Sequence, residues 1–298
     1  MTIDSLLSQL PKFSRAHGSH LGVIRLTGPD SAKFLQGQYT SDTNLLSPTA
    51  SLYGAVCNPK GRIISSFFAL KAPQGENLLL VMERDLVETT LTHLQKYAVF
   101  FKTQLSDASD EFALYLEYDQ RGAEQEETVA NTLATVAEDS TIVITTTAGN
   151  LQRHLRLVSG EQSLEEVQAD AAPVFELLIA RPLTNLADTS NLLPQWLNMQ
   201  ANGGINFRKG CYTGQEIIAR MKYKGQSKKQ MGLFASSAPL NEGSDITNEQ
   251  GKNIGSVWRS ASFGDLHIAL AIYNVEEDVQ YQCADSALTQ LPLPYEVA

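Results

Sequence analysis

The motif KGCYTGQE at residues 209–216 holds the side chains best suited to do chemistry in this chain. Cys211 is the candidate nucleophile, because a cysteine thiolate attacks electrophiles and binds metals. Thr213 and Glu216 have the spacing of a capping box, in which each side chain accepts a hydrogen bond from the other residue's backbone N–H. An apolar run follows at 217–221, so the spacing predicts that a helix begins at this motif.

The expected surroundings of Cys211 would favour its thiolate. The positive end of the helix dipole lies close by, and Arg208 and Lys209 add positive charge. Such a setting lowers a cysteine pKa from about 8.5 toward neutrality. Gly210 and Gly214 would let backbone or ligand approach closely. The alternative is that Cys211 is a small buried hydrophobe, as free cysteines often are, but its polar, charged and glycine neighbours do not require that role.

The charge of the chain is unevenly distributed. The net charge is −10 and the pI is near 5.0, which opposes general affinity for nucleic acid. Residues 208–229 nevertheless carry seven cations against one acid, Glu216. We predict an anion site here, for a carboxylate-bearing ligand, a phosphate or a partner surface, while a simply solvated face is the alternative. The cations are Arg208, Lys209, Arg220, Lys222, Lys224, Lys228 and Lys229.

Length and composition bound the class of protein. A chain of 298 residues exceeds what one core usually serves, so two or three domains are expected. The N-terminus lacks a basic leader, and no apolar stretch approaches the roughly 20 residues that span a bilayer. The three cysteines, Cys57, Cys211 and Cys283, are too few and too scattered for a disulfide framework, so a cytoplasmic location is expected. We expect no metal site at His17 and His20.

The elements that must position the motif follow from apolar periodicity and turn residues. Alternating or continuous apolar runs predict strands at 22–26, 53–57, 63–70, 78–82, 112–118 and 155–158. Helices are expected from residue 32 to Gly37, over 84–98, and over 129–136 after the acidic segment 124–127. This mixture predicts an α+β fold. Short β runs at 231–235, 254–258 and 267–272, separated by frequent turn signals, predict a small C-terminal all-β barrel or sandwich.

The chain resembles the family of tRNA-modifying, folate-binding proteins related to the T-protein, the aminomethyltransferase of the glycine cleavage system. The signature of that family is the motif at 209–216, present here without a change. Further matches run along nearly the whole chain: Thr27-Gly28-Pro29-Asp30, Phe34-Leu35-Gln36-Gly37-Gln38 with Thr40 and Asp42, Lys96-Tyr97-Ala98-Val99-Phe100, Pro194-Gln195, Gly203-Gly204-Ile205 and Pro292-Leu293-Pro294-Tyr295.

The resemblance implies a fold and a function. The fold would be a T-protein-like (GcvT-like) ring, with two interleaved α+β portions in residues 1–228 and an antiparallel β-barrel in residues 229–298. The ring would bind tetrahydrofolate or a one-carbon derivative in a central channel. The family is associated with assembly or repair of iron–sulfur enzymes, including the radical methylthiotransferase that modifies tRNA. Because the chain is acidic, we expect it to act through such a partner enzyme, with no strong direct nucleic-acid binding and no membrane association.

One departure from the aminomethyltransferase pattern bears on enzyme activity. In that family an Asn and Gly turn leads to a pair of aspartates, whereas here Asn58 and Gly61 lead to Ser65 and Ser66. A serine supplies neither the charge nor the basicity of a carboxylate near neutral pH. Aminomethyltransferase activity is therefore not expected, and the chain need not be an enzyme in the ordinary sense.

The resulting hypothesis gives each candidate residue a role. Cys211 is the reactive group and Lys209 supports its thiolate. Tyr212 and Phe175 would pack on the pterin, although core packing is the more common role for Phe175. The remaining folate-binding candidates are Gln195, Leu21, Arg220, Lys222 and Lys224, the last three for the glutamate carboxylates or for a partner surface. Two other functions stay open: a folate-dependent one-carbon transferase with a cysteine nucleophile, and a ligand-free scaffold.

Overall fold

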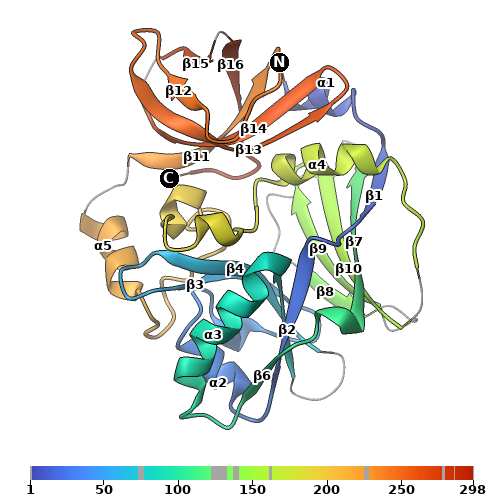
Figure 1. The fold of residues 1–298 in the computed structure, drawn as a ribbon, viewed down its shortest axis with the longest axis vertical. Coiled ribbons are helices and arrows are strands. Elements are labelled where there is room, and N and C mark those ends of the chain that lie inside the picture. Colours follow the sequence, from blue (N-terminus) through green and yellow to red (C-terminus); the bar gives the residue numbers. More distant parts are fainter. Residues whose placement is uncertain are drawn as a thin grey trace.

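Two five-stranded sheets and a closed barrel make up the computed structural model (Figure 1). It describes residues 2–72, 77–121, 133–136, 141–160, 163–224, 228–276, 279–284 and 286–297, with only the backbone at 133–136 and 224. The first sheet has the strand order β1 (Phe13–His17), β7 (Phe112–Gln120), β10 (Leu151–Ser159), β9 (Ile142–Ala148) and β8 (Leu133–Val136). The second has the order β3 (Leu52–Cys57), β4 (Ile63–Lys71), β5 (Leu78–Glu83), β2 (Leu21–Thr27) and β6 (Gln104–Asp107).

The chain passes twice between the two sheets. Strand β1 pairs with β7 in the first sheet, although β2 to β6 lie between them in sequence and form the second sheet. The two α+β portions are therefore interleaved. Helices α1 (Ile3–Leu7), α2 (Ser31–Gln36), α3 (Val87–Ala98), α4 (Ala172–Ile179) and α5 (Gln215–Lys224) accompany them. None of the helices in the described ranges is long and apolar enough to cross a membrane.

The C-terminal strands close into a six-stranded antiparallel barrel. Its order is β11 (Lys229–Ser236), β14 (Leu266–Asn274), β13 (Asn253–Phe263), β12 (Asp245–Thr247), β15 (Tyr281–Cys283) and β16 (Ser286–Leu291), which pairs back to β11. Closure pairs every edge of the short strands, which an open sheet of this size would leave exposed. The predicted α+β fold with two interleaved portions and a C-terminal antiparallel barrel is thereby confirmed.

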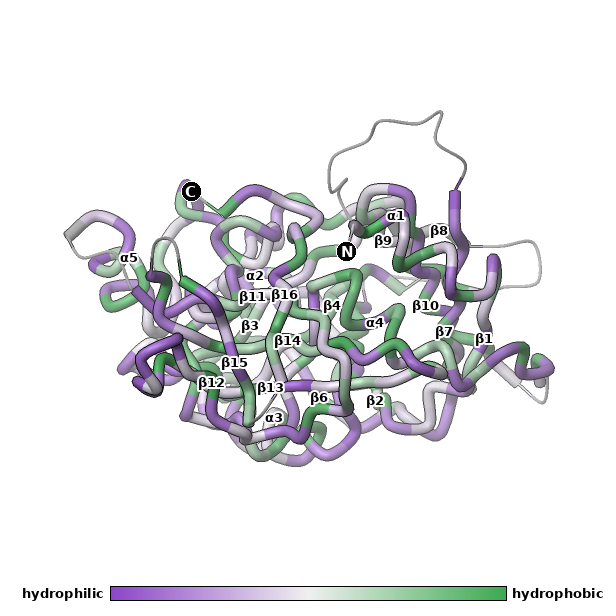
Figure 2. Tube along the Cα trace, turned by 90° about the horizontal axis from the view of Figure 1, so that it is seen from above, coloured by the Kyte–Doolittle hydropathy of each residue, from purple (hydrophilic) through white to green (hydrophobic). Residues whose placement is uncertain are grey.

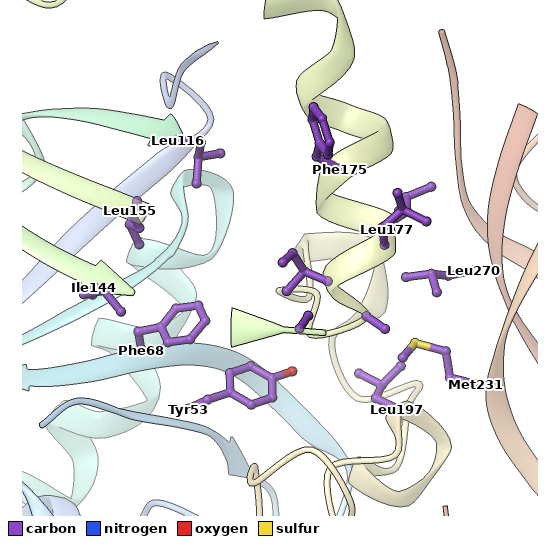
Figure 3. Packing of buried hydrophobic residues seen from close by; sticks show 14 of the residues in the cluster. Tyr53, Phe68, Leu116, Ile144, Leu155, Phe175, Leu177, Leu197, Met231 and Leu270 are labelled. Carbon is purple, nitrogen blue, oxygen red and sulfur yellow. The ribbon is translucent and has the colours of Figure 1, made fainter. Parts of the chain in front are cut away.

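Strand β4 shows how one sheet serves two cores. All of its residues except Lys71 are buried, and alternate side chains point to opposite faces. Phe68 contributes to the large core that the sheets share with α4 and the barrel, while Phe67 contributes to a smaller core beneath α2 and α3. Helix α4 lies between the first sheet and the barrel, with Phe175 and Leu177 packed in the shared core (Figure 3). The three parts are thus held by one continuous apolar cluster.

Two predicted elements differ from the structure. The helix expected over 129–136 is wrong at its C-terminal end, because 133–136 form strand β8, paired with β9; the acidic segment 124–127 lies outside the described residues. The β-branched and apolar residues of 133–136 fit a sheet edge once β9 is there to pair with. The helix expected over 84–98 begins with a 3-10 turn at Arg84–Leu86 before α3 starts at Val87.

Candidate functional site

The cysteine motif belongs to a loop that packs against the segment after α2. We call residues 206–214 the motif loop and residues 36–43 the α2 segment. Backbone bonds join them: Asn206 N–H donates to the Thr40 carbonyl at 2.9 Å, and Thr213 N–H donates to the Gly37 carbonyl at 3.1 Å. The Thr213 hydroxyl donates to Gln38 Oε1 at 3.2 Å. Two stretches about 170 residues apart in sequence therefore form one folded unit.

The Lys209 side chain connects the motif loop to the α2 segment. Its ammonium group donates to the carbonyl oxygens of Gln36, Tyr39 and Ser41 at 2.7, 2.6 and 2.9 Å, and the residue is 7% exposed. These three bonds use all the donors that an ammonium has. Burial lowers the Lys209 pKa to about 8, with the charge of Asp42 partly opposing the shift. Lys209 therefore orders the α2 segment, and only its charge remains to act on Cys211.

Cys211 itself is exposed on the motif loop, in contrast to the two other thiols. Cys57 and Cys283 are buried, and burial raises the pKa of each. Tyr212, the residue after Cys211, points inward with 7% exposure, and the Lys209 ammonium lies 5.0 Å from its ring centroid. The inward Tyr212 and Lys209 anchor the loop, and the outward Cys211 is presented to solvent.

Helix α5 begins later than the capping-box spacing predicted. The helix starts at Gln215, so Gly214 occupies the cap position that was assigned to Thr213. Gly214 has φ +85°, and a Cβ there would lie 2.7 Å from the Asn58 carbonyl oxygen, so no other residue fits this position without strain. The predicted capping box is therefore not formed. A Cβ at Gly210 would meet nothing within 4 Å, so close approach explains Gly214 and not Gly210.

A second site is a cavity of about 130 Å³ where both sheets, α4 and the barrel meet. Its wall combines apolar side chains with several ionisable groups. Leu21, Phe68 and Glu83 come from the second sheet, Leu116, Arg153 and Leu155 from the first, and Glu176 and Leu177 from α4; His20, Pro182, Leu183 and Arg259 complete it. Enclosed apolar cavities with a few polar groups are the usual setting for small-molecule recognition.

Burial shifts the protonation of two groups in this cavity. It raises the pKa of Glu83 to about 8, an effect reinforced by the nearby carboxylates of Asp85 and Glu176 and opposed by Arg259. Burial also lowers the pKa of His20, with Glu176 partly opposing the shift. At neutral pH the cavity therefore offers a largely protonated carboxyl group and a neutral imidazole, both able to donate and accept hydrogen bonds.

A buried ion pair supports the cavity wall. Arg153, with 2% of its side chain exposed, donates to Glu176 Oε1 at 2.6 Å, and the Tyr118 hydroxyl donates to Glu176 Oε2 at 2.7 Å. The Arg153 guanidinium also lies 4.8 Å from the ring centroid of Phe68. These contacts connect β10, β7, α4 and β4 across the cavity.

Arg259 lines both this cavity and a larger outer cleft. The cleft has a volume of about 640 Å³ and lies between the barrel strands and residues 192–196. Asp188 fixes the wall between the two spaces, because it pairs with Arg259 and accepts from Trp258 Nε1 at 2.8 Å. The lining of the cleft is mixed in charge, because it includes Lys229 and Arg259 as well as Glu242 and Asp245.

The predicted folate-binding residues fall in five places. Leu21 lines the central cavity, and Phe175 is fully buried in the core, stacked on Tyr118 with ring centroids 5.4 Å apart. Gln195 is buried and donates to the Ile218 carbonyl at 2.8 Å, away from the cavity wall. Tyr212 anchors the motif loop. Arg220 and Lys222 are exposed on α5, and for Lys224, in the same helix, only the backbone is described.

The cavity groups His20, Glu83, Arg153, Glu176 and Arg259 were missed by sequence reasoning. None of them belongs to a recognisable motif: Glu176 interrupts an apolar run, His20, Glu83 and Arg259 stand at the ends of such runs, and Arg153 stands between two other polar residues. One sequence signal could have indicated such residues: a charged residue at a position of a strand where the alternation of apolar and polar residues predicts a buried side chain. Arg153 in β10 is such a case, since its neighbours on the same face, Leu151 and Leu155, are buried.

Both serines of the pair at 65 and 66 are buried. Ser66 Oγ accepts from Thr184 N–H at 2.8 Å, and Ser66 N–H donates to Thr184 Oγ1 at 3.0 Å. Ser65 is also fully buried, and neither serine lines the central cavity. No carboxylate stands at these positions.

The two interleaved sheets, the closed barrel and the cavity between them define an aminomethyltransferase-type fold. The glycine cleavage system aminomethyltransferase T from Bartonella henselae superposes with a TM-score of 0.70 over 98% of this chain and 88% of its own, at 16% identity. No family model matches the chain.

Sequence relatives are more specific. The tRNA-modifying protein YgfZ of Aliivibrio fischeri strain ES114 is 32% identical over 306 residues, covering 96% of this chain and 93% of that protein. The proteins of the same name from Pectobacterium carotovorum and Vibrio atlanticus are 31% and 29% identical, over 91% and 96% of this chain and 88% and 93% of those proteins. The chain belongs to the YgfZ family of tRNA-modifying proteins.

The raised pKa of Glu83 predicts a stability effect. Unfolded, a glutamate ionises near pH 4.3, so between about pH 4 and 8 the folded protein retains a proton that the unfolded chain has lost. This contribution to stability is present below pH 4 and is lost as the pH rises through 8. Glu83→Gln should remove this pH dependence, so that between pH 5 and pH 8 the unfolding free energy of wild type falls by about 3–4 kcal/mol more than that of the variant.

Urea unfolding at the two pH values measures this difference. Glu88→Gln, which changes an exposed carboxylate in the first turn of α3, is the matched control and should leave the pH profile of wild type unchanged. Parallel profiles for wild type and the Glu83 variant would show that Glu83 ionises normally in the folded protein.

Proposed function

We propose that this protein binds a tetrahydrofolate in its central cavity and supports tRNA modification by assembling or repairing iron–sulfur enzymes of the radical methylthiotransferase type, with Cys211 as its reactive group. The observation that carries the proposal is the motif loop: Cys211 is exposed while Lys209 and Tyr212, on either side of it, are anchored in the interior. An outward thiol on an internally braced loop is suited to react with a second macromolecule. We place this activity in the cytoplasm, where thiols stay reduced.

The cavity residues fit a reduced pteridine in chemical terms. Phe68 and Leu21 provide apolar surface for the faces of a flat ring, and Glu83 and His20 can both donate and accept at its edge. At about 130 Å³ the cavity holds only part of a folate, since whole ligands occupy roughly 300 Å³ or more. The rest of the ligand would lie outside this cavity, on the side of Arg259, which lines both the cavity and the outer cleft. A bound tetrahydrofolate would supply one-carbon carrier chemistry.

Cys211 and the cavity serve different steps in this proposal. No residue of the motif loop is among the residues that line the cavity wall in the described part of the chain. A covalent step between Cys211 and a folate in the cavity is therefore not part of the proposal, and this separation disfavours the one-carbon transferase alternative. Cys211 would instead face the partner enzyme, and folate occupancy would stabilise the ring of three parts around the cavity.

Two variants test the two halves separately. Leu21→Trp fills the cavity and should abolish the heat of tetrahydrofolate binding in calorimetry. Cys211→Ala should keep that heat but fail to restore methylthio-modified nucleosides, measured by mass spectrometry of tRNA, in a strain lacking its own copy of the protein. Cys283→Ala, which removes a buried barrel thiol, should restore them.

The outcomes have distinct meanings. Normal tRNA modification with the Cys211 variant would refute the role of the thiol. Absence of any folate heat with wild type would refute the folate part and favour a ligand-free scaffold.

A further inference from the structure

An exposed patch of cations and aromatic rings surrounds helix α5. We call Phe207, Arg208, Arg220, Lys222 and Tyr223 the α5 face. Arg208, Arg220, Lys222 and Tyr223 are exposed, and Tyr223 retains 69% of its accessible surface. Figures 1 and 2 both show α5 at the outer rim of the molecule, with the barrel and the second sheet on its inner side.

The aromatic rings of the α5 face are held in place. The Lys222 ammonium lies 3.8 Å from the ring centroid of Phe207 and 5.5 Å from that of Tyr223. The two rings meet edge to face, with centroids 6.4 Å apart and planes at 74°. The contact of one cation with two aromatic rings stabilises this arrangement. The exposed Tyr223 ring is therefore already ordered, and a partner that binds it pays less conformational entropy.

The cations of the α5 face are available to a partner. Within the described ranges, Arg208, Arg220 and Lys222 form no ion pair with a carboxylate. The β3–β4 turn packs closely against α5, since a Cβ on Gly61 would lie 3.0 Å from Ile217. The exposed Lys60 in this turn therefore adds a further positive charge near the α5 face. This local excess of positive charge stands on a chain of net charge −10, so an anionic partner is attracted here and repelled elsewhere.

Charge and ring together select the class of partner. An acidic protein surface would pair with the cations, but carboxylates gain nothing from an exposed flat ring. A single-stranded nucleic acid matches both features, because its phosphates pair with cations and its unstacked bases stack on aromatic side chains.

We propose that the α5 face binds a single-stranded segment of RNA, with Arg208, Arg220 and Lys222 on the phosphates and Tyr223 stacked on a base. Helix α5 directly follows the motif loop, so this surface adjoins the exposed Cys211 in the chain. The acidic remainder of the molecule limits such binding to this face and keeps it weak at high salt. The inference does not depend on folate binding or on the chemistry of Cys211.

Fluorescence anisotropy with a labelled oligouridine of about 12 nucleotides tests the proposal on the whole protein. Log Kd should depend linearly on log salt, and Arg220→Gln or Lys222→Gln should each reduce the slope by about 0.7. Tyr223→Ala should weaken binding roughly tenfold and leave the slope unchanged, because a stacked base carries no charge to the contact. These side chains are exposed, so the variants should fold, which thermal melting checks.

Two controls decide between RNA and an acidic protein. Lys96→Gln removes an exposed cation of α3 and should leave affinity and salt slope unchanged. Unlabelled polyglutamate of matched charge should compete poorly. No binding of oligouridine, or binding that survives Tyr223→Ala and is displaced equally by polyglutamate, would overturn the proposal; the second result would assign the α5 face to acidic protein surfaces.

Discussion

Replacing Lys209 with methionine is expected to destabilise the folded protein by about 3 kcal/mol, although the residue stands beside the reactive cysteine. Methionine keeps the apolar stem but removes the ammonium that binds the carbonyls of Gln36, Tyr39 and Ser41. These acceptors would lose their partner in a site where Lys209 itself is only 7% exposed. Each buried carbonyl that loses its partner costs about 1–3 kcal/mol. Water can bind to some of the three carbonyls and recover part of this loss, so the expected total lies near the lower end of the summed cost.

Urea unfolding followed by circular dichroism measures the effect. Lys60→Met, at the exposed β3–β4 turn, removes the same charge and should change the unfolding free energy by no more than about 0.5 kcal/mol. Arginine at position 209 should not restore wild-type stability, because a planar guanidinium cannot direct its donors at three carbonyls grouped around one nitrogen. A Lys209→Met protein as stable as wild type would show that the motif lysine acts on Cys211 and not on the α2 segment.

Replacing Arg153 with methionine should cost about 3 kcal/mol of unfolding free energy. The guanidinium is the partner of Glu176 across the central cavity and is 2% exposed. Removing it leaves the Glu176 carboxylate, among the residues that the structure describes, with the Tyr118 hydroxyl as its remaining hydrogen-bond donor. A charge that is mostly buried and has lost its ionic partner is the main source of the expected cost.

The same strand provides a control for this prediction. Arg156 of β10 pairs with Glu117, but Arg15 pairs with the same carboxylate, so Arg156→Met should cost about 1 kcal/mol or less. The double variant Arg153→Met with Glu176→Gln should be more stable than Arg153→Met alone, because the unpaired charge is gone. Equal losses for Arg153→Met and Arg156→Met in denaturant melts would refute a special role for the cavity pair.

The local pattern of apolar residues predicted the secondary structure correctly wherever a segment has only one way to bury its apolar side chains. The runs at 22–26, 53–57 and 63–70 became β2, β3 and β4, and the turn between the last two is fixed by Asn58, whose side chain accepts from Lys60 N–H and Arg62 N–H. The predicted helix at 133–136 failed because a short apolar run fits either a helix face or a sheet edge. Pairing with β9 decided the outcome, and that partner is not a local property of the run.

The candidate site shows the same division. The exposure of Cys211 agrees with its polar and glycine neighbours, which needed no tertiary information. The target of Lys209 could not be predicted, because the three carbonyls that it binds lie about 170 residues away in sequence. The capping box failed for a related reason, since the Asn58 carbonyl occupies the space beside Gly214 and the helix starts one residue later. The boundaries 1–228 and 229–298 for two domains stay a prediction.

By itself, the sequence determined the motif with its outward cysteine, the concentration of cations at residues 208–229 and the alternation that forms the sheets and barrel. These properties are local, because they depend on residue type and on spacing within a few turns or strands. Only the tertiary structure decided that Lys209 points inward, that Phe207 of the motif loop meets Lys222 and Tyr223 of α5, and that Glu83, Arg153 and Arg259 meet in one cavity. Such groups come from separate elements, so their proximity, and the burial that shifts their protonation, arise only when the two sheets and the barrel pack together.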